Sequence, residues 1–173
     1  GWNAEQIFWQ LAVEDIRAAA DLFLPLYRQT SAEDGYVSLE VNPRLAHETA
    51  GTVAEARRLW AQVDRPNLLI KIPATLEGLP AIRQVIASGI NVNVTLIFSI
   101  ARYRQVMDAY LAGLEERVKA GQPIVNIASV ASFFVSRIDT KVDKMIGESA
   151  PHLVGKLAIA NAKLAYQEFR QVF

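Results

Sequence analysis

Two hydrophobic periods alternate along this chain. Short apolar runs lie between longer segments in which apolar residues recur with the spacing of an amphipathic helix. The apolar runs predict four strands, at residues 36–41, 68–72, 90–96 and 124–130. The helical segments are residues 4 to the late twenties, 52–63, 79–87, 100–120, 135–146 and 156–173. Because a helix separates each strand from the next, the pattern predicts parallel βαβ units in an α/β fold.

Polar side chains occupy one face of several predicted strands. In the third strand, the polar face carries Asn91, Asn93 and Thr95. The opposite face carries Val92, Val94 and Leu96. In the first strand, Ser38 and Glu40 share a face in the same way. A parallel strand of a doubly wound sheet is apolar on both faces, whereas a polar inner face is typical of a (β/α) barrel near its carboxyl rim. The faces therefore favour the barrel.

The number of strands is half of what such a barrel needs. A TIM barrel has eight strands and typically about 250 residues. This chain has 173 residues and four predicted strands. We therefore expect residues 1–173 to form a single domain with about four βα units, a half-barrel of the (β/α)8 family. Its unpaired strand edges predict self-association, and a homo-oligomer is one possible result.

Composition excludes several classes of protein. Hydrophobic residues make up 51% of the chain, which excludes extensive disorder. Eighteen basic residues balance 18 acidic ones, so no charge excess favours nucleic acid. There is no cysteine, and the two histidines lack metal-ligand spacing. No apolar run is long enough for a membrane span, and no signal peptide is evident. We expect a cytoplasmic protein without membrane, nucleic-acid or metal partners.

One lysine interrupts an apolar strand, in the run L-L-I-K-I-P-A that contains Lys71. Glu40, Thr95 and Ser132 also lie near predicted strand ends, and the four residues are separated by 31, 24 and 37 positions. Each interval is about one βα unit, so the four side chains could meet at one rim. Apolar walls disfavour an ammonium group, and a neutral amine can attack a ketone and form a Schiff base. A nearby carboxylate and a hydroxyl can then move protons.

Structural roles explain some of these residues equally well. Lys71 could be an edge lysine that reaches solvent, and Glu40 could simply pair with Arg44 or with Lys71. Asn93 and Thr95 could satisfy each other inside a barrel. Three further residues have ordinary interpretations, since Arg137 could be a solvated charge and the Phe133-Phe134 pair could belong to the core. The residue types alone leave these alternatives open.

Four ordered segments carry a resemblance to a known family. They are V-S-L-E-V-N-P-R-L at 37–45, L-I-K-I-P-A-T at 69–75, G-I-N-V-N-V-T-L-I-F-S at 89–99 and S-F-F-V-S-R-I-D at 132–139. They resemble the successive strand-end motifs of transaldolase, and I-A-N-A-K-L-A-Y at 159–166 extends the resemblance toward the end of the chain. Transaldolases are Schiff-base enzymes on a TIM barrel. They move a dihydroxyacetone unit from a ketose phosphate, such as fructose 6-phosphate or sedoheptulose 7-phosphate, to an aldose phosphate in the pentose phosphate pathway, without a cofactor.

The resemblance implies a role for each matching residue. Lys71 matches the Schiff-base lysine, and Glu40 and Thr95 match the pair that positions a catalytic water. The residues matching the substrate-binding groups are Asn93 and Ser132 for hydroxyls, Arg137 for a phosphate and Phe134 for the lining of the site. Related fructose-6-phosphate aldolases place glutamine and tyrosine at positions 40 and 134, so this chain follows the transaldolase choice at both.

Other parts of the family pattern have no counterpart in these 173 residues. The strand-one aspartate that acts as general base, a strand-two asparagine and a strand-seven arginine are among them. The resemblance therefore covers strands three to six, without the first two and last two. It implies that this chain by itself is nearly inactive. The alternatives are a catalytically inactive, self-associating structural module, an aldolase-like enzyme, and a binding protein for sugar phosphates.

Overall fold

One open, parallel sheet organises the chain. The computed structural model describes all 173 residues. The strands are β1 (Val37–Glu40), β2 (Leu68–Pro73), β3 (Val92–Ile97) and β4 (Ser129–Phe133). They pair in the order β1-β2-β3-β4, and every pair is parallel. This confirms the predicted α/β class, with four parallel strands that correspond to half of an eight-stranded barrel. Each outer strand, β1 and β4, pairs on one side only.

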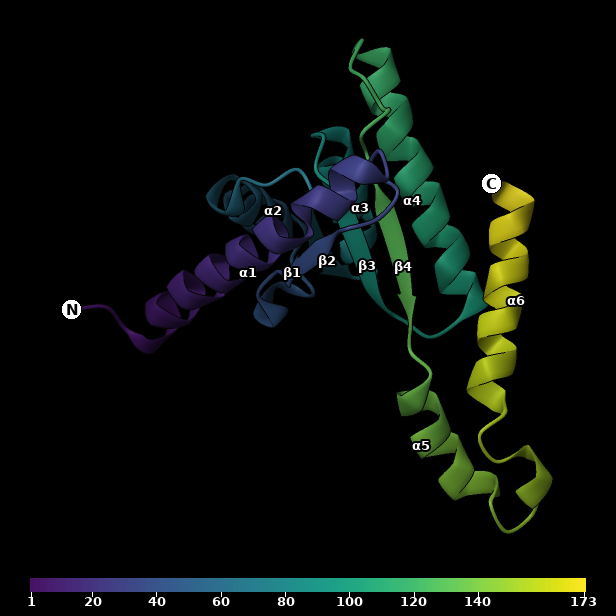
Figure 1. Cartoon of the computed structure of the whole chain (residues 1–173). Coiled ribbons are helices and arrows are strands. Elements are labelled where there is room, and N and C mark those ends of the chain that lie inside the picture. Colours follow the sequence, from purple (N-terminus) through teal and green to yellow (C-terminus); the bar gives the residue numbers. More distant parts are fainter.

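Helices connect the strands and extend beyond both ends of the sheet (Figure 1). They are α1 (Ala4–Gln29), α2 (Thr49–Val63), α3 (Gly78–Ala87), α4 (Ile100–Lys119), α5 (Ser136–Ile146) and α6 (Leu157–Val172), with short 3-10 turns η1 (Pro43–Leu45) and η2 (Pro151–Leu153). The predicted start of α1 is confirmed, because the Asn3 side chain accepts a hydrogen bond from the Gln6 backbone N–H and the Gln6 side-chain oxygen accepts one from the Asn3 backbone N–H. The Ser99 hydroxyl caps α4 similarly, accepting from the Arg102 N–H.

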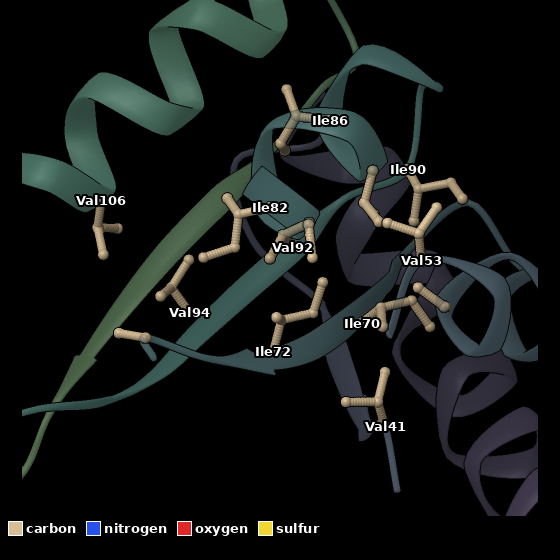
Figure 2. Close-up of a cluster of buried hydrophobic side chains, with 14 of the residues drawn as sticks. Val41, Val53, Ile70, Ile72, Ile82, Ile86, Ile90, Val92, Val94 and Val106 are labelled. Atoms are coloured by element: carbon tan, nitrogen blue, oxygen red, sulfur yellow. The ribbon is translucent and has the colours of Figure 1, made fainter. Parts of the chain in front are cut away.

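The core lies between the sheet and the helices α2, α3 and α4. Ile70, Ile72, Val92 and Val94 point from the strands to this side and are completely buried. Figure 2 shows them among side chains of the helical layer and its connections, including Val53, Ile82, Ile86 and Val106. Burial of each such side chain stabilises the fold by roughly 1.5–3 kcal/mol. Because side chains alternate along a strand, this packing directs the intervening residues of β1, β2 and β3 to the opposite face.

A buried asparagine joins α1 to the sheet. The Asn67 side-chain amide donates to the backbone oxygens of Ala20 in α1 and Gly35 before β1, at 2.9 and 2.8 Å. Gly35 has a φ of +82°, and a Cβ there would lie 2.5 Å from the backbone nitrogen of Tyr27. Position 35 therefore requires glycine for two independent reasons. Asn67 precedes β2 directly, so it connects the start of the lysine-bearing strand to α1.

The predicted fourth strand was wrong in position. Residues 124–130 were expected, whereas β4 is Ser129–Phe133. Side chains hold the preceding segment in a loop: the Arg117 guanidinium donates to the Pro123 oxygen, and the Asn91 side-chain oxygen accepts from the Ala128 N–H. The apolar residues Ile124 and Val125 are exposed in this loop. Because of these side-chain contacts, the strand begins five residues later than predicted and ends three residues later.

The expected alternation of β3 fails at Leu96. The strand begins at Val92 rather than at residue 90 and ends at Ile97. Leu96 has a φ of +58°, and the pairing with β4 shifts between Val94 and Ile97. This is a β-bulge, which lets Ile97 become fully buried in place of Leu96. Leu96 therefore does not continue the face formed by Val92 and Val94.

The last third of the chain packs sparsely. Figure 1 shows α5 beyond the end of β4, and α6 running back alongside α4. No residue of α5 is buried, and α6 buries only Ala158 and Ala165. Arg104 of α4 and Glu168 of α6 form a bidentate ion pair with distances of 2.7 and 2.6 Å. None of the helices is both long and apolar enough to pass through a bilayer.

Candidate active site

Three polar side chains form a row across adjacent strands. Glu40 is paired in register with Lys71, and Lys71 is paired with Asn93. Residues paired in this way point to the same face of a parallel sheet. Helices α2, α3 and α4 cover the other face, so all three side chains lie on the side that the helical layer leaves open. The polar face predicted from the sequence is therefore present.

Lys71 reaches this open face from an apolar strand. Its strand neighbours Ile70 and Ile72 are completely buried, and 29% of the Lys71 side chain is exposed. Its Nζ atom lies 3.2 Å from Oε2 of Glu40, whose side chain is 44% exposed. Of the two partners expected for Glu40, the structure selects Lys71 rather than Arg44. A pair this accessible stabilises the fold only slightly, so stability alone does not account for it.

Thr95 lies farther along β3 toward the rim. It is paired with Pro73 and is almost completely buried, and its backbone oxygen accepts from the Ala74 N–H at 2.8 Å. Thr95 therefore shares the face and the rim with the lysine. Its hydroxyl makes no hydrogen bond with Lys71 or Glu40, and none with Asn93. The expectation that Asn93 and Thr95 satisfy each other is wrong, because Asn93 has other partners.

Asn93 lies between two serine hydroxyls. The Ser132 hydroxyl of β4 donates to Asn93 Oδ1 at 2.8 Å, and Asn93 Nδ2 donates to the Ser38 hydroxyl of β1 at 3.1 Å. The chain of hydrogen bonds thus spans the sheet from β1 to β4. Ser38 was placed on the Glu40 face from its spacing but was not among the predicted site residues. The signal for it was the alternation that placed the Glu40 side chain.

An aromatic residue and an arginine lie together beyond β4. The Phe134 ring lies 5.3 Å from the Phe98 ring, and the Arg137 guanidinium lies 4.6 Å from the Phe134 ring centre. Phe133 points the other way and packs edge-on against Tyr103 of the core. Arg137 also lines a shallow polar cavity of about 410 Å³, with Ser136, Thr140, Lys141 and Lys144 of α5. The excess of positive charge suits an anion such as a phosphate.

Six of the seven predicted residues therefore form three groups, and the Thr95 hydroxyl joins none of them. Lys71 pairs with Glu40, Asn93 pairs with Ser132, and Phe134 pairs with Arg137. Register joins the first two groups through the Lys71–Asn93 pairing. No hydrogen bond or ion pair joins the third group to the other two. The first two groups can act on one small polar ligand, and the third can bind a more distant anionic part of it.

The loops after β1 and β2 are joined at the same rim by a histidine and a glutamate. His47 Nδ1 lies 3.2 Å from Glu77 Oε2. Two hydrogen bonds to the Glu77 carboxylate lower the pKa of Glu77 below its usual range. The larger effect comes from the backbone of Glu77 itself, and the smaller from the His47 side chain. Both side chains are well exposed. No three histidine, cysteine, aspartate or glutamate side chains converge as metal ligands would.

Comparison with known proteins identifies the family. The family model described as Transaldolase/Fructose-6-phosphate aldolase matches residues 2–172. The chain belongs to this family. Among named relatives, the transaldolase of Saccharopolyspora erythraea is 58% identical over 175 residues, which cover 100% of this chain and 47% of that protein. The transaldolase of Thermobifida fusca is also 58% identical, over 177 residues covering 100% of the chain and 48% of that protein. Transaldolase 1 of Streptomyces avermitilis is 54% identical over 177 residues, with 100% and 47% covered.

The segment that matches the transaldolase/fructose-6-phosphate aldolase family contains every residue of the candidate site, since the match begins before Glu40 and ends after Arg137. The chain spans about half the length of the relatives it matches. Four strands and about half the length agree with the predicted half-barrel.

Proposed function

We propose that this chain is the lysine-bearing part of a transaldolase. In this proposal, Lys71 forms a Schiff base with a ketose phosphate and transfers a dihydroxyacetone unit to an aldose phosphate. The observation that supports it most directly is the row Glu40–Lys71–Asn93, with the Lys71 amine 3.2 Å from a carboxylate on the open face of the sheet. An amine with a proton-transfer group beside it is what imine formation needs.

The chemistry follows from these two groups. Lys71 passes a proton to the Glu40 carboxylate, 3.2 Å away, and the free amine attacks the ketone carbon and forms a carbinolamine. Loss of water then needs a proton delivered to the leaving hydroxyl, and the Glu40 carboxyl is placed to deliver it. The resulting protonated imine accepts the electron pair of the adjacent carbon–carbon bond when that bond breaks. The aldose phosphate leaves, and the lysine keeps an enamine that attacks the next aldehyde. The base that removes the sugar hydroxyl proton comes, in this proposal, from another part of the full-length protein.

The other predicted residues act on the substrate. Asn93 and Ser132 offer an amide and a hydroxyl to the hydroxyls of the dihydroxyacetone unit, and Thr95 holds the water that relays protons. Arg137 binds the phosphate in the polar cavity on α5, and Phe134 orients the guanidinium by stacking. The ligands are thus sugar phosphates. A cytoplasmic location and a place in the pentose phosphate pathway belong to the same proposal.

Two residues favour transfer over the aldolase activity that also appears in the family name. Glu40 and Phe134 resemble the transaldolase pattern, in which an acidic residue and a ring without a hydroxyl take these places. A structural role without catalysis has one observation in its favour, because β1 and β4 leave two strand edges unpaired. We propose that these edges pair with the rest of a barrel or with a second half-barrel, and that this chain alone has little turnover.

Trapping the imine tests the proposal. The full-length protein is mixed with fructose 6-phosphate and sodium borohydride, which reduces an imine to a stable secondary amine. Peptide mass spectrometry should find the ketose adduct on Lys71. The variant Lys71→Met, which keeps a long side chain without an amine, should give no adduct and should lose transfer activity by at least about 10³-fold. A protein that transfers the unit without any adduct on Lys71 would contradict the proposal.

A further inference from the structure

The Ser38 hydroxyl has no part in the reaction just described, yet it contacts the site through Asn93. It belongs to β1, and Asn93 belongs to β3, so the hydrogen bond between them passes across β2. On β2 the residue in register with Ser38 is Leu69, which is buried and apolar. Among the side chains of β1 and β2, only Ser38 forms a hydrogen bond with the Asn93 amide. Ser38 lies two residues before Glu40, which is the residue in register with Lys71.

The two serines use half of the hydrogen-bonding capacity of Asn93. An amide side chain has two donor hydrogens and two acceptor lone pairs. Ser38 accepts one hydrogen, and Ser132 donates to one lone pair. One Nδ2 hydrogen and one Oδ1 lone pair therefore remain outside these two hydrogen bonds. These remaining groups can bind a substrate hydroxyl that both donates and accepts.

The position of the amide depends on Ser38 and Ser132 together. A hydroxyl can either donate or accept, so one serine alone could satisfy the oxygen or the nitrogen of a rotated amide equally well. The terminal torsion of asparagine is soft and has two broad preferences. Partners on both β1 and β4 restrict this torsion, because the plane of the amide must then lie along the line between the two hydroxyls. In the structure Nδ2 faces Ser38 of β1 and Oδ1 faces Ser132 of β4.

We propose that Ser38 is a positioning residue that sets the preference of this site for ketoses with a hydroxyl beside the imine carbon. It acts through the Asn93 amide and, beyond it, through Ser132. This inference rests on the function proposed above. Without Ser38, the amide can rotate, and the energy gained from that substrate hydroxyl falls. A ketose substrate that lacks this hydroxyl loses no binding energy, so the ratio of kcat/KM between the two ketoses becomes smaller.

The test measures discrimination rather than activity alone. In the full-length protein, kcat/KM is compared for fructose 6-phosphate and for its 1-deoxy and 3-deoxy analogues. We expect Ser38→Ala to reduce the preference for fructose 6-phosphate over one of the analogues by about tenfold, the scale of one hydrogen bond, mainly through KM. Ser38→Thr keeps the hydroxyl and should restore the preference. Ser129→Ala is the matched control, because the Ser129 hydroxyl donates to the Val92 backbone oxygen outside this chain of hydrogen bonds.

The outcomes separate the two proposals. If Ser38→Ala forms the Lys71 adduct and both preferences equal those of the unaltered protein, the Ser38 inference is wrong while the proposed function stands. If the unaltered protein forms no adduct, the proposed function is wrong. Should Ser38→Ala fail to fold, Ser38→Cys keeps a similar volume with a poor hydrogen-bonding group. The same loss of preference in Ser38→Cys supports the inference, and an unchanged preference overturns it.

Discussion

Side chains pack much more densely in the β1–α4 region, residues 37–119, than in the β4–α6 region, residues 129–172. The first contains nearly all of the completely buried side chains, including Leu59, Ile70 and Ile86. The second buries only Ala158 and Ala165. Between α4, β4 and α6 lies an open apolar groove of about 640 Å³, lined by residues such as Tyr110, Phe133 and Phe169. A parallel strand is ordinarily covered on both faces, and β4 is not.

The difference divides the candidate site. Lys71, Glu40, Asn93 and Thr95 belong to the β1–α4 region, where the core determines the register of their strands. Of the remaining predicted residues, Ser132 lies in β4, Phe134 follows β4 directly and Arg137 lies at the start of α5. The part proposed to form the imine is therefore held in place by its own core. The part expected to bind the phosphate depends on neighbours for the unpaired edge of β4.

The largest difference between the regions should appear in truncations of their side chains. Ile70→Ala removes a completely buried side chain of β2 and should lower the free energy of unfolding by about 2–5 kcal/mol. Leu164→Ala, in α6, removes a side chain that is 53% exposed and should change it by no more than about 0.5 kcal/mol. Urea denaturation of both variants measures this. Equal losses would show that α6 packs as firmly as the sheet.

Amide hydrogen exchange should rank the same regions without any mutation. Backbone amides of β2 and β3 lie inside the sheet, and we expect them to exchange only when the whole domain opens. Amides of α5, which buries no residue, should exchange at least about tenfold faster through local opening. Mass spectrometry of peptides from both segments reports the rates. Matching protection in α5 and β2 would contradict the division into two regions.

The smallest expected effect concerns the ion pair that joins α6 to α4. The hydrogen bond from Arg104 lowers the pKa of Glu168 below its ordinary value of 4.5. A carboxyl whose pKa is lowered in the folded state stabilises the fold at pH values above its ordinary pKa. This contribution is lost as the pH falls through the lowered pKa. Acid should therefore loosen α6 before the sheet. The chemical shifts of α6 amides, followed by NMR below pH 4.5, should show this step. Glu168→Gln should lack the step, and its persistence there would assign it to another group.

Local sequence patterns were sufficient for the elements that the core determines. The spacing of Leu68 to Ile72 predicted both the strand and the face of Lys71, and the structure begins β2 at Leu68. Alternation placed Ser38 and Glu40 together, and the register agrees. In these strands, the period of the side chains and the need to bury one face lead to the same arrangement.

Long-range polar contacts account for the failures. The run that contains Ile124 and Val125 has the composition of a strand, but Arg117 and Asn91 hold the adjoining backbone in a loop. Both partners are distant in sequence or lie on another element, so no local pattern contains them. The positive φ of Leu96 is similar, because leucine rarely adopts that conformation and nothing in its neighbours indicates it. The Asn93–Ser38 hydrogen bond joins residues 55 positions apart and needed the sheet order to be found.

The buried amide of Asn67 limits which substitutions this sequence tolerates. Its two hydrogen bonds require a main-chain oxygen at position 35, and position 35 accepts no residue with a side chain. Aspartate or leucine at position 67 would leave both oxygens without a donor, so neither half of the arrangement can change first without a penalty. Among relatives, we expect glycine at 35 to persist even where position 67 changes, because its φ and its contact with Tyr27 do not involve Asn67. A change at position 67 should instead accompany a change in how α1 packs against the start of β2.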